Sequence, residues 1–187
     1  MGPVAIGIIV VAVLLVGMAI LIYNGLVRRK VETQNAWSQI DVQLKRRYDL
    51  IPNLVETVKG YAAHERGTLE AVIAARGGAI QAAQTPGVAD RAQAENALTQ
   101  TLGRLFALAE SYPALQANQN FRALQSELAA TEDKVAYARQ FYNSAVQTFN
   151  TSVQSVPTNV IAGITGFRRR DFFEALGGER GPMQVRF

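Results

Sequence analysis

Cysteine is absent from this sequence of 187 residues, and histidine occurs once, as His64. Without cysteine the chain can form no disulfide framework, thiol nucleophile or cysteine-ligated zinc or iron–sulfur centre. A lone histidine leaves histidine-based triads and multi-histidine metal sites without a second member. His64 and Glu65 begin like a zinc-protease motif, but Thr68 stands where the second histidine would be. We therefore expect no enzymatic activity, no metal and no cofactor.

Charge is also scarce. Only 18% of the residues are charged, against ~25% in ordinary soluble domains, and 49% are hydrophobic. A chain this apolar is not expected to be disordered, because disordered segments carry too little apolar surface to build a core. Some of the apolar surface should therefore face something other than water.

The apolar residues gather at the N-terminus, where residues 1–27 carry no charged side chain. The run from Val4 to Tyr23 would form a helix of roughly 30 Å, the thickness of the hydrocarbon core of a bilayer. A cleaved signal peptide fits poorly, because no basic residue precedes the run and no small-residue cleavage site follows it. We predict a retained transmembrane helix over residues 4–27, with residues 1–3 outside the cytoplasm.

Basic residues follow the span at once, as Arg28, Arg29 and Lys30. By the positive-inside rule, residues 28 onward then lie in the cytoplasm. Residues 28–47 hold six Lys or Arg and two Asp or Glu, so the basic character is concentrated next to the membrane. We expect the first three cations to contact anionic lipid head groups. A nucleic-acid partner is not expected, since no nucleic-acid-binding motif is visible.

Small residues recur within the span. Ala5, Ala12 and Ala19 are seven residues apart and fall on one stripe of a helix. Such a stripe allows two transmembrane helices to approach closely. The alternative is that alanine is simply common in such helices.

Beyond the span, the spacing of apolar residues predicts helices. One stripe has steps of three or four residues throughout, the helical period; it comprises Ala36, Ile40, Leu44, Tyr48, Ile51, Val55, Val58 and Ala62. Pro52 interrupts this stretch, and we expect a kink there because proline removes a backbone donor. Gly67 and the Gly77-Gly78 pair are weak points at which the helix could break, and Thr85-Pro86-Gly87 predicts a turn.

Two further helices are expected, over about 88–111 and then from Phe121 to a stop at Pro157. The last has a 3.5-residue repeat typical of coiled-coil-like packing; its stripe is Phe121, Leu124, Leu128, Thr131, Val135, Ala138, Tyr142, Ala145, Phe149, Ser152 and Val156. No run of alternating β-branched residues predicts a strand. The fold class is therefore all-α: a transmembrane helix, an up-down bundle of three to four long helices over residues 28–156 with a coiled-coil-like third helix, and a short C-terminal docking helix.

The tail, residues 157–187, combines glycine with large apolar groups and with Arg168-Arg169-Arg170. We expect Phe172 and Phe173, on a short helix, to dock on the bundle or on a neighbour. The three arginines could bind lipid head groups or an acidic partner, or could be a solvated charge run.

Trp37, Lys45, Arg46, Arg47 and Tyr48 are the candidate protein interface in the bundle, together with the two tail phenylalanines. Trp, Tyr and Arg are favoured at interfaces. Trp37 lies one position off the buried stripe and could equally be a boundary residue of the core. The second basic trio is too far from the span to feel lipid if the helix stands upright, and then serves a protein contact.

Several motifs resemble the LemA family of bacterial membrane proteins. The longest is NAWSQIDVQLKRRYDLIPNLV at 35–55; shorter matches include His64-Glu65, Glu110-Ser111-Tyr112-Pro113, Pro157-Thr158-Asn159 and the ending Val185-Arg186-Phe187. The resemblance implies a single-span protein of the bacterial inner membrane, with its N-terminus outside, a cytoplasmic helical bundle and no established enzymatic activity or cofactor. One relative acts in forming magnetosome membranes, and some members are encoded beside a membrane metalloprotease.

Two interpretations of function remain. In the first, the protein is a non-catalytic, membrane-anchored scaffold or membrane organiser whose partners are the lipid bilayer and further copies of itself. In the second, it is a regulatory adaptor for a membrane enzyme such as a metalloprotease, and a membrane protein is its partner.

Overall fold

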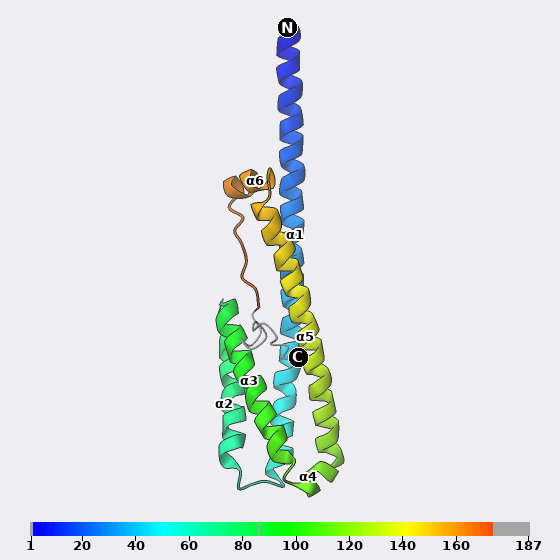
Figure 1. Cartoon of the computed structure of the whole chain (residues 1–187), viewed down its shortest axis with the longest axis vertical. Coiled ribbons are helices and arrows are strands. Elements are labelled where there is room, and N and C mark those ends of the chain that lie inside the picture. The colour runs from blue at the N-terminus through cyan, green and yellow to red at the C-terminus, as the bar shows by residue number, and fades with distance from the viewer. Residues whose placement is uncertain (1, 86, 174–187) are drawn as a thin grey trace, which may run out of the picture. The chain divides into compact units, whose positions relative to one another are not determined.

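The structure is a computed structural model, which describes residues 2–85 and 87–173. Over these residues it contains helices and no strand (Figure 1). The helices are α1 (Pro3–Lys59), α2 (Arg66–Ala82), α3 (Val88–Ala109), α4 (Pro113–Ala117), α5 (Gln119–Gln154) and α6 (Thr158–Thr165). The predicted all-α class is confirmed. Pro86, in the predicted turn, and the tail from 174 to Phe187 lie outside the described residues.

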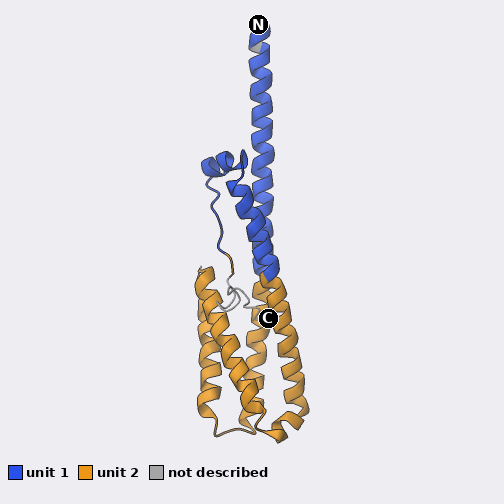
Figure 2. Ribbon diagram, in the orientation of Figure 1, with its two compact units in different colours: residues 1–38, 140–171 blue, residues 39–139, 172–187 orange. Residues whose placement is uncertain are grey.

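The chain divides into two compact units, each built from two separate stretches of sequence (Figure 2). The first unit comprises residues 1–38 and 140–171, and the second comprises residues 39–139 and 172–187. Two helices, α1 and α5, therefore contribute residues to both units. The boundaries at 38/39 and 139/140 fall inside α1 and α5, whereas the boundary at 171/172 falls in the non-helical segment after α6.

The second unit has its core between the later part of α1, α2, α3 and the first part of α5. Every member of the predicted α1 stripe is buried, from Ala36, which belongs to the first unit, to Ala62. The α1 helix continues through Pro52 to Lys59, and α2 continues through Gly67, Gly77 and Gly78. These residues weaken a helix by only ~1 to ~3 kcal/mol each, which burial of an apolar stripe can offset. The break between the helices falls instead at residues 60–65.

The predicted stripe of α5 is buried along almost its whole length, with Leu124 half-buried. The exception is Val156, which is 81% exposed. The helix ends at Gln154, so the register that buries the stripe stops before Val156. The predicted helix of residues 88–111 corresponds to α3, whose Leu98, Leu102 and Leu105 are buried.

The first unit contains the apolar start of α1, the second half of α5, and α6. Large apolar side chains are exposed along α1 as far as Leu21, which is 73% exposed, whereas Leu26 is 1% exposed. Among the described residues, one helix is long and apolar enough to cross a membrane, and it is α1. Packing against other helices therefore begins where the apolar run ends.

The segment after α6 returns along α5 without helical structure. The chain turns at Gly166, whose φ of +75° lies in the left-handed region that favours glycine. The side-chain amide of Asn150 then bonds both backbone groups of Arg170: its Nδ2 donates to the carbonyl at 2.9 Å and its Oδ1 accepts from the N–H at 2.8 Å. The Tyr142 hydroxyl donates to the carbonyl of Asp171 at 3.0 Å.

The tail contains a short helix, α6, but the expectation that this helix carries the two phenylalanines is wrong, because α6 ends at Thr165. Phe172 and Phe173 follow α6 in non-helical backbone. The physical reason is that Asn150 and Tyr142 occupy the backbone polar groups of residues 170 and 171, which a helix would need for its own hydrogen bonds.

Candidate functional site

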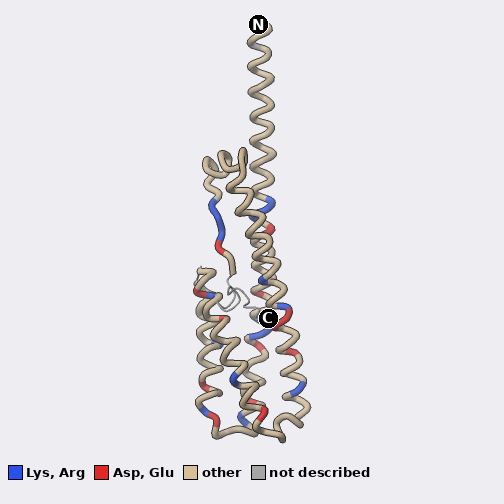
Figure 3. The backbone as a smooth tube through the Cα atoms, in the orientation of Figure 1, with Lys and Arg blue, Asp and Glu red and all other residues tan. Residues whose placement is uncertain are grey.

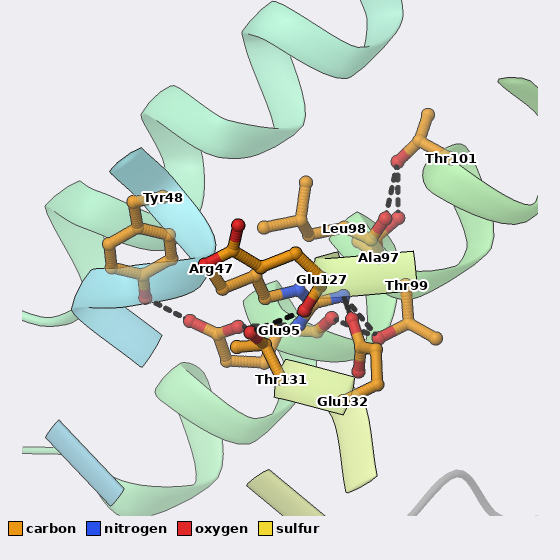
Figure 4. Close-up of polar contacts among 10 residues, drawn as sticks. All are labelled: Arg47, Tyr48, Glu95, Ala97, Leu98, Thr99, Thr101, Glu127, Thr131 and Glu132. Carbon is orange, nitrogen blue, oxygen red and sulfur yellow. Dashed lines mark hydrogen bonds and ion pairs between the residues drawn. The ribbon is translucent and has the colours of Figure 1, made fainter. Parts of the chain in front are cut away.

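The interior of the second unit holds a charged side chain. Arg47 on α1 is fully buried, and its guanidinium is held by groups from two other helices (Figure 4). Its Nη1 lies 3.0 Å from Oε2 of Glu95 on α3, and its Nη2 lies 2.7 Å from Oε1 of Glu132 on α5. Nη2 also donates to Oγ1 of Thr99 at 2.7 Å. We call Arg47, Tyr48, Glu95, Thr99 and Glu132 the Arg47 cluster.

Tyr48 joins the cluster from the neighbouring position of α1. Its hydroxyl donates a hydrogen bond to Glu95, the carboxylate that also pairs with Arg47. Burial raises the pKa of Tyr48 well above its ordinary value, and the hydrogen bond to Glu95 adds to the effect. Arg76 of α2 donates from Nε to the Tyr48 carbonyl at 2.8 Å. The cluster thus joins α1, α3 and α5, and the contact of Arg76 with Tyr48 links α2 to it.

Burial also affects other charged groups in the cluster and around it. Burial raises the pKa of Glu132, against the opposing attraction of Arg47 and Arg139. Burial also lowers the pKa of Arg139, whose guanidinium lies 4.7 Å from the ring centre of Phe173. Arg91 pairs with Asp41 at 2.5 Å and is itself largely buried. Opposite charges therefore offset one another across the interior of the unit.

Such an arrangement is suited to fixing helix positions. Removing one partner of a buried ion pair typically costs 3–5 kcal/mol, because it leaves a charge without compensation. Arg47 is compensated only when α1, α3 and α5 bring residues 47, 95 and 132 together.

Within residues 2–85 and 87–173, no group of three or more His, Cys, Asp or Glu is placed to hold a metal ion.

The other candidate interface residues of α1 lie in different environments from Arg47 and Tyr48. Lys45 pairs with Asp49 at 3.0 Å and Arg46 with Glu127 at 2.7 Å, and all four side chains are substantially exposed. Trp37, in the first unit, is half-buried and packs edge-on to Tyr142, with ring centres 5.1 Å apart.

The two tail phenylalanines also differ from each other. Phe172 is 39% exposed, whereas Phe173 is buried with the ring of its side chain against Arg139. Only the exposed members of the candidate interface, chiefly Lys45, Arg46 and Phe172, are accessible at the surface of a single chain.

The predicted lipid-contacting cations lie in the first unit, where all three are exposed. Arg29 donates to the Ser152 hydroxyl, and Nζ of Lys30 lies 5.8 Å from the ring centre of Phe167. In the predicted packing stripe of the span, Ala12 is exposed and Ala19 is half-buried. The side chain of Ala5 lies outside what the structure describes.

Sequence reasoning missed the partners of Arg47, although a signal was present. Arg91 and Glu95 continue the α3 stripe of Leu98, Leu102 and Leu105 with steps of four, three, four and three residues. Charged residues at stripe positions face the interior of a bundle. Glu132 follows Thr131 of the α5 stripe and gives a weaker signal.

Replacing Arg47 with methionine should destabilise the fold strongly. Arg47→Met leaves the fully buried Glu95 and the half-buried Glu132 without their cation, and we expect a loss of ~3–5 kcal/mol in the free energy of unfolding. The matched control is Arg46→Met, which removes a half-exposed ion pair and should cost ~1 kcal/mol or less. Urea unfolding in detergent, followed by circular dichroism, measures both; equal losses in the two variants would contradict the role given to Arg47.

Stability should also depend on the titration of Glu132. Because burial raises its folded-state pKa, folded Glu132 takes up its proton at a higher pH than the unfolded chain does. Lowering the pH through the interval between the two pKa values therefore stabilises the fold. The difference in free energy of unfolding between wild type and Glu132→Gln should shift in favour of the wild type as the pH falls through that interval. A difference that stays constant with pH would show that Glu132 does not titrate in this way.

Comparison with known proteins shows relatives over most of the chain. Two magnetosome proteins of Paramagnetospirillum magneticum, MamQ 1 and MamQ 2, are 31% identical over 175 residues, covering 81% of this chain and 64% of each relative. Magnetosome protein MamQ of Magnetospirillum gryphiswaldense is 29% identical over 174 residues, with the same coverage of 81% and 64%. Protein LemA of Metamycoplasma hominis is 26% identical over 174 residues, covering 90% of this chain and 78% of the relative.

The chain therefore spans slightly less than two thirds of the length of the MamQ proteins it matches. The sequence profile of the LemA family matches residues 36–187, which include the Arg47 cluster, α5 and α6. Because this match covers most of the chain, the protein belongs to the LemA family.

Proposed function

We propose that this protein is a non-catalytic, membrane-anchored scaffold that self-associates and organises the membrane around it. The observation that carries the proposal lies in the first unit. There, the exposed apolar stretch of α1 passes without a loop into the part of the same helix that is packed, from Leu26 to Ala36. With no linker between them, association of the spans constrains the packed helices directly, as a scaffold requires.

Two further points support the proposal. The LemA family and the exposed apolar helix both support association with a membrane. Relatives named as magnetosome proteins favour a membrane-organising role, since a magnetosome is a membrane-bounded compartment. The stripe of Ala12 and Ala19, with Ala5 before them, is the part of the span best suited to close helix–helix contact.

A regulatory adaptor for a membrane enzyme, such as a metalloprotease, is the second candidate. It is favoured by a groove of about 410 Å³ in the second unit. Apolar Val55, Leu69 and Ile73 line this groove together with Lys59 and Arg66. Such a mixture of apolar and charged lining suits a protein segment. An adaptor would use the groove without any need for self-association.

We place the N-terminus outside the cytoplasm and the bundle inside it, in the inner membrane of a bacterium. The support is the charge difference across the span, with Arg28, Arg29 and Lys30 on one side only. His64, exposed between α1 and α2, and the C-terminal Phe187, outside the described residues, then face the cytoplasm.

Reporter fusions at the C-terminus test this orientation. A fluorescent protein fused after Phe187 should fluoresce, and alkaline phosphatase fused there should be inactive, because that enzyme needs an oxidising compartment. Replacing Arg28, Arg29 and Lys30 with glutamine should weaken the orientation bias. Active phosphatase at the C-terminus of the unaltered protein would reverse the proposed topology.

The scaffold proposal predicts more than one chain per particle when the full protein is measured by native mass spectrometry in lipid nanodiscs. The double variant Lys45→Gln/Arg46→Gln should lower the oligomeric fraction, because it removes two exposed cations from the candidate interface. Their ion pairs with Asp49 and Glu127 are exposed, so the fold should lose little stability. Arg47 is left unchanged, since its loss would strongly destabilise the bundle.

The matched control is Lys59→Gln, which removes an exposed cation that also pairs within its own helix, with Glu56 at 3.7 Å. It should leave the mass distribution as in wild type. Strictly monomeric particles at micromolar concentration would rule out the scaffold. Cross-linking in native membranes then separates the two candidates: self-links alone support the scaffold, and links confined to one membrane enzyme support the adaptor.

A further inference from the structure

The short helix α6 presents an apolar face to its surroundings. Val160 is 58% exposed and Ile164 is 78% exposed, and the four-residue spacing places them on the same face. Val156, just before the helix, is 81% exposed, whereas Ala162 on α6 is 1% exposed. Ala162 therefore faces the protein while three branched apolar side chains face outward. A contiguous exposed apolar surface commonly marks a membrane or protein contact.

An aromatic contact fixes α6 beside the end of the span. After the turn at Gly166, the N–H of Phe167 donates to the Ala162 carbonyl at 3.0 Å. The Phe167 ring then lies with its centre 5.8 Å from that of Tyr23 on α1 and 6.3 Å from that of Phe149 on α5. Figure 1 shows α6 next to α1 accordingly. The helix is thus held at the level of Tyr23.

The level of Tyr23 is also where the hydrocarbon core should end. The described apolar side chains from Val4 to Leu21 are largely exposed, and the core of the first unit begins at Leu26. Residues 4 to 21 form a helix of roughly 27 Å, close to the ~30 Å of the hydrocarbon core. Tyr23 is an aromatic residue suited to the membrane interface. The α6 helix therefore lies at the boundary between lipid and water.

Basic residues flank α6 on the side away from the hydrocarbon core. Arg28 and Lys30 on α1, and Arg168 and Arg169 after the Gly166 turn, are all exposed. Figure 3 shows basic positions on both segments of this unit, while the preceding part of α1 carries no charged residue. Arg28 lies five residues beyond Tyr23, about 8 Å along the helix axis, which is within the distance over which charges act at physiological salt. Anionic lipid head groups match this pattern of charge.

We propose that α6 is a second membrane contact: it lies in the interface, with Val160 and Ile164 among the upper acyl chains and Arg168 and Arg169 on anionic head groups. An apolar face beside a basic segment is the arrangement by which short helices lie on membranes. We assign lipid rather than protein to the apolar face of α6, because this face lies at the level of Tyr23, where the exposed apolar stretch of α1 ends. The inference rests on the anchored state of the proposed function, and requires neither self-association nor a partner enzyme.

The absence of cysteine allows a direct test with single-cysteine variants of the full chain. Ile164→Cys and Val160→Cys probe α6, Leu14→Cys probes the span, and Ser144→Cys is a matched exposed control on α5 of the same unit. Each protein carries a nitroxide label in nanodiscs of mixed phosphatidylglycerol and phosphatidylcholine. Collision of the label with oxygen, which concentrates in lipid, is compared with collision with a water-soluble nickel complex.

At positions 14, 160 and 164, the label should collide more often with oxygen than with the nickel complex. At position 144 it should collide more often with the nickel complex. Water-like values, in which collision with the nickel complex predominates, at positions 160 and 164 would overturn the inference. If oxygen collision still predominated at position 14, the predicted span would stand. A water-like value at 14 would instead overturn the anchored state itself. Labels at 160 and 164 that neither reagent reaches would assign the apolar face to a second copy of the chain, which also contradicts the inference.

The arginines are tested in the Ile164→Cys background. In the anionic nanodiscs, Arg168→Gln/Arg169→Gln should increase collision of the label at position 164 with the nickel complex. The rate should approach that of the protein with both arginines in nanodiscs of phosphatidylcholine alone. Arg122→Gln, an exposed arginine of the second unit, is the control and should have no effect. Equal nickel access with and without the two arginines would remove the head-group contact from the inference.

Discussion

The guanidinium of Arg47 constrains much of the second unit. A buried cation costs several kcal/mol unless groups of opposite charge surround it, and here those groups come from α3 and α5. Glu95 and Glu132 must therefore arrive at the same place, which fixes the rotation and the axial position of both helices against α1. The apolar stripes alone would tolerate displacement of one helix along another by a turn, because each apolar side chain would then pack against a similar one. The ion pairs do not, since Arg47 has one matching position on each helix.

In the first unit, polar side chains organise the return of the chain. The side-chain amide of Asn150 donates to the Arg170 carbonyl and accepts from the Arg170 N–H, and the Tyr142 hydroxyl donates to the Asp171 carbonyl. These contacts replace the hydrogen bonds that a helix would have supplied, so the segment remains extended along α5. Phe167 meets Tyr23 and Phe149 at the other end of this segment. The ring contacts of Phe167 therefore hold the start of this segment, next to α6, and the polar side chains of α5 hold its end.

The sequence predicted helices and the inward faces of the long ones well, and for one reason. Residues such as Ile40, Leu102 and Val135 recur at the helical period, and the period identifies both the helix and the face that it buries. The same reasoning left the helix ends and the effect of Gly77 undecided. Gly77 lies within a continuous helix, and α1 runs through Pro52, in agreement with the unbroken period of its stripe. Packing of a whole stripe outweighs the local cost at one position. Local propensity is a weak guide wherever tertiary contacts compete with it.

Sequence alone determined the all-α class, the apolar span, the basic residues beside it and the stripes that become the core, since each depends on residues near one another along the chain. Only the tertiary structure decided which charged and aromatic residues are buried and which partners they contact. Arg46 and Arg47 are adjacent and chemically identical, yet one pairs at the surface and the other is fully buried. Helix rotation separates the two, and the partners lie 81 and 48 residues away in sequence. Charge pairing over such separations follows from how the helices pack, which no local pattern encodes.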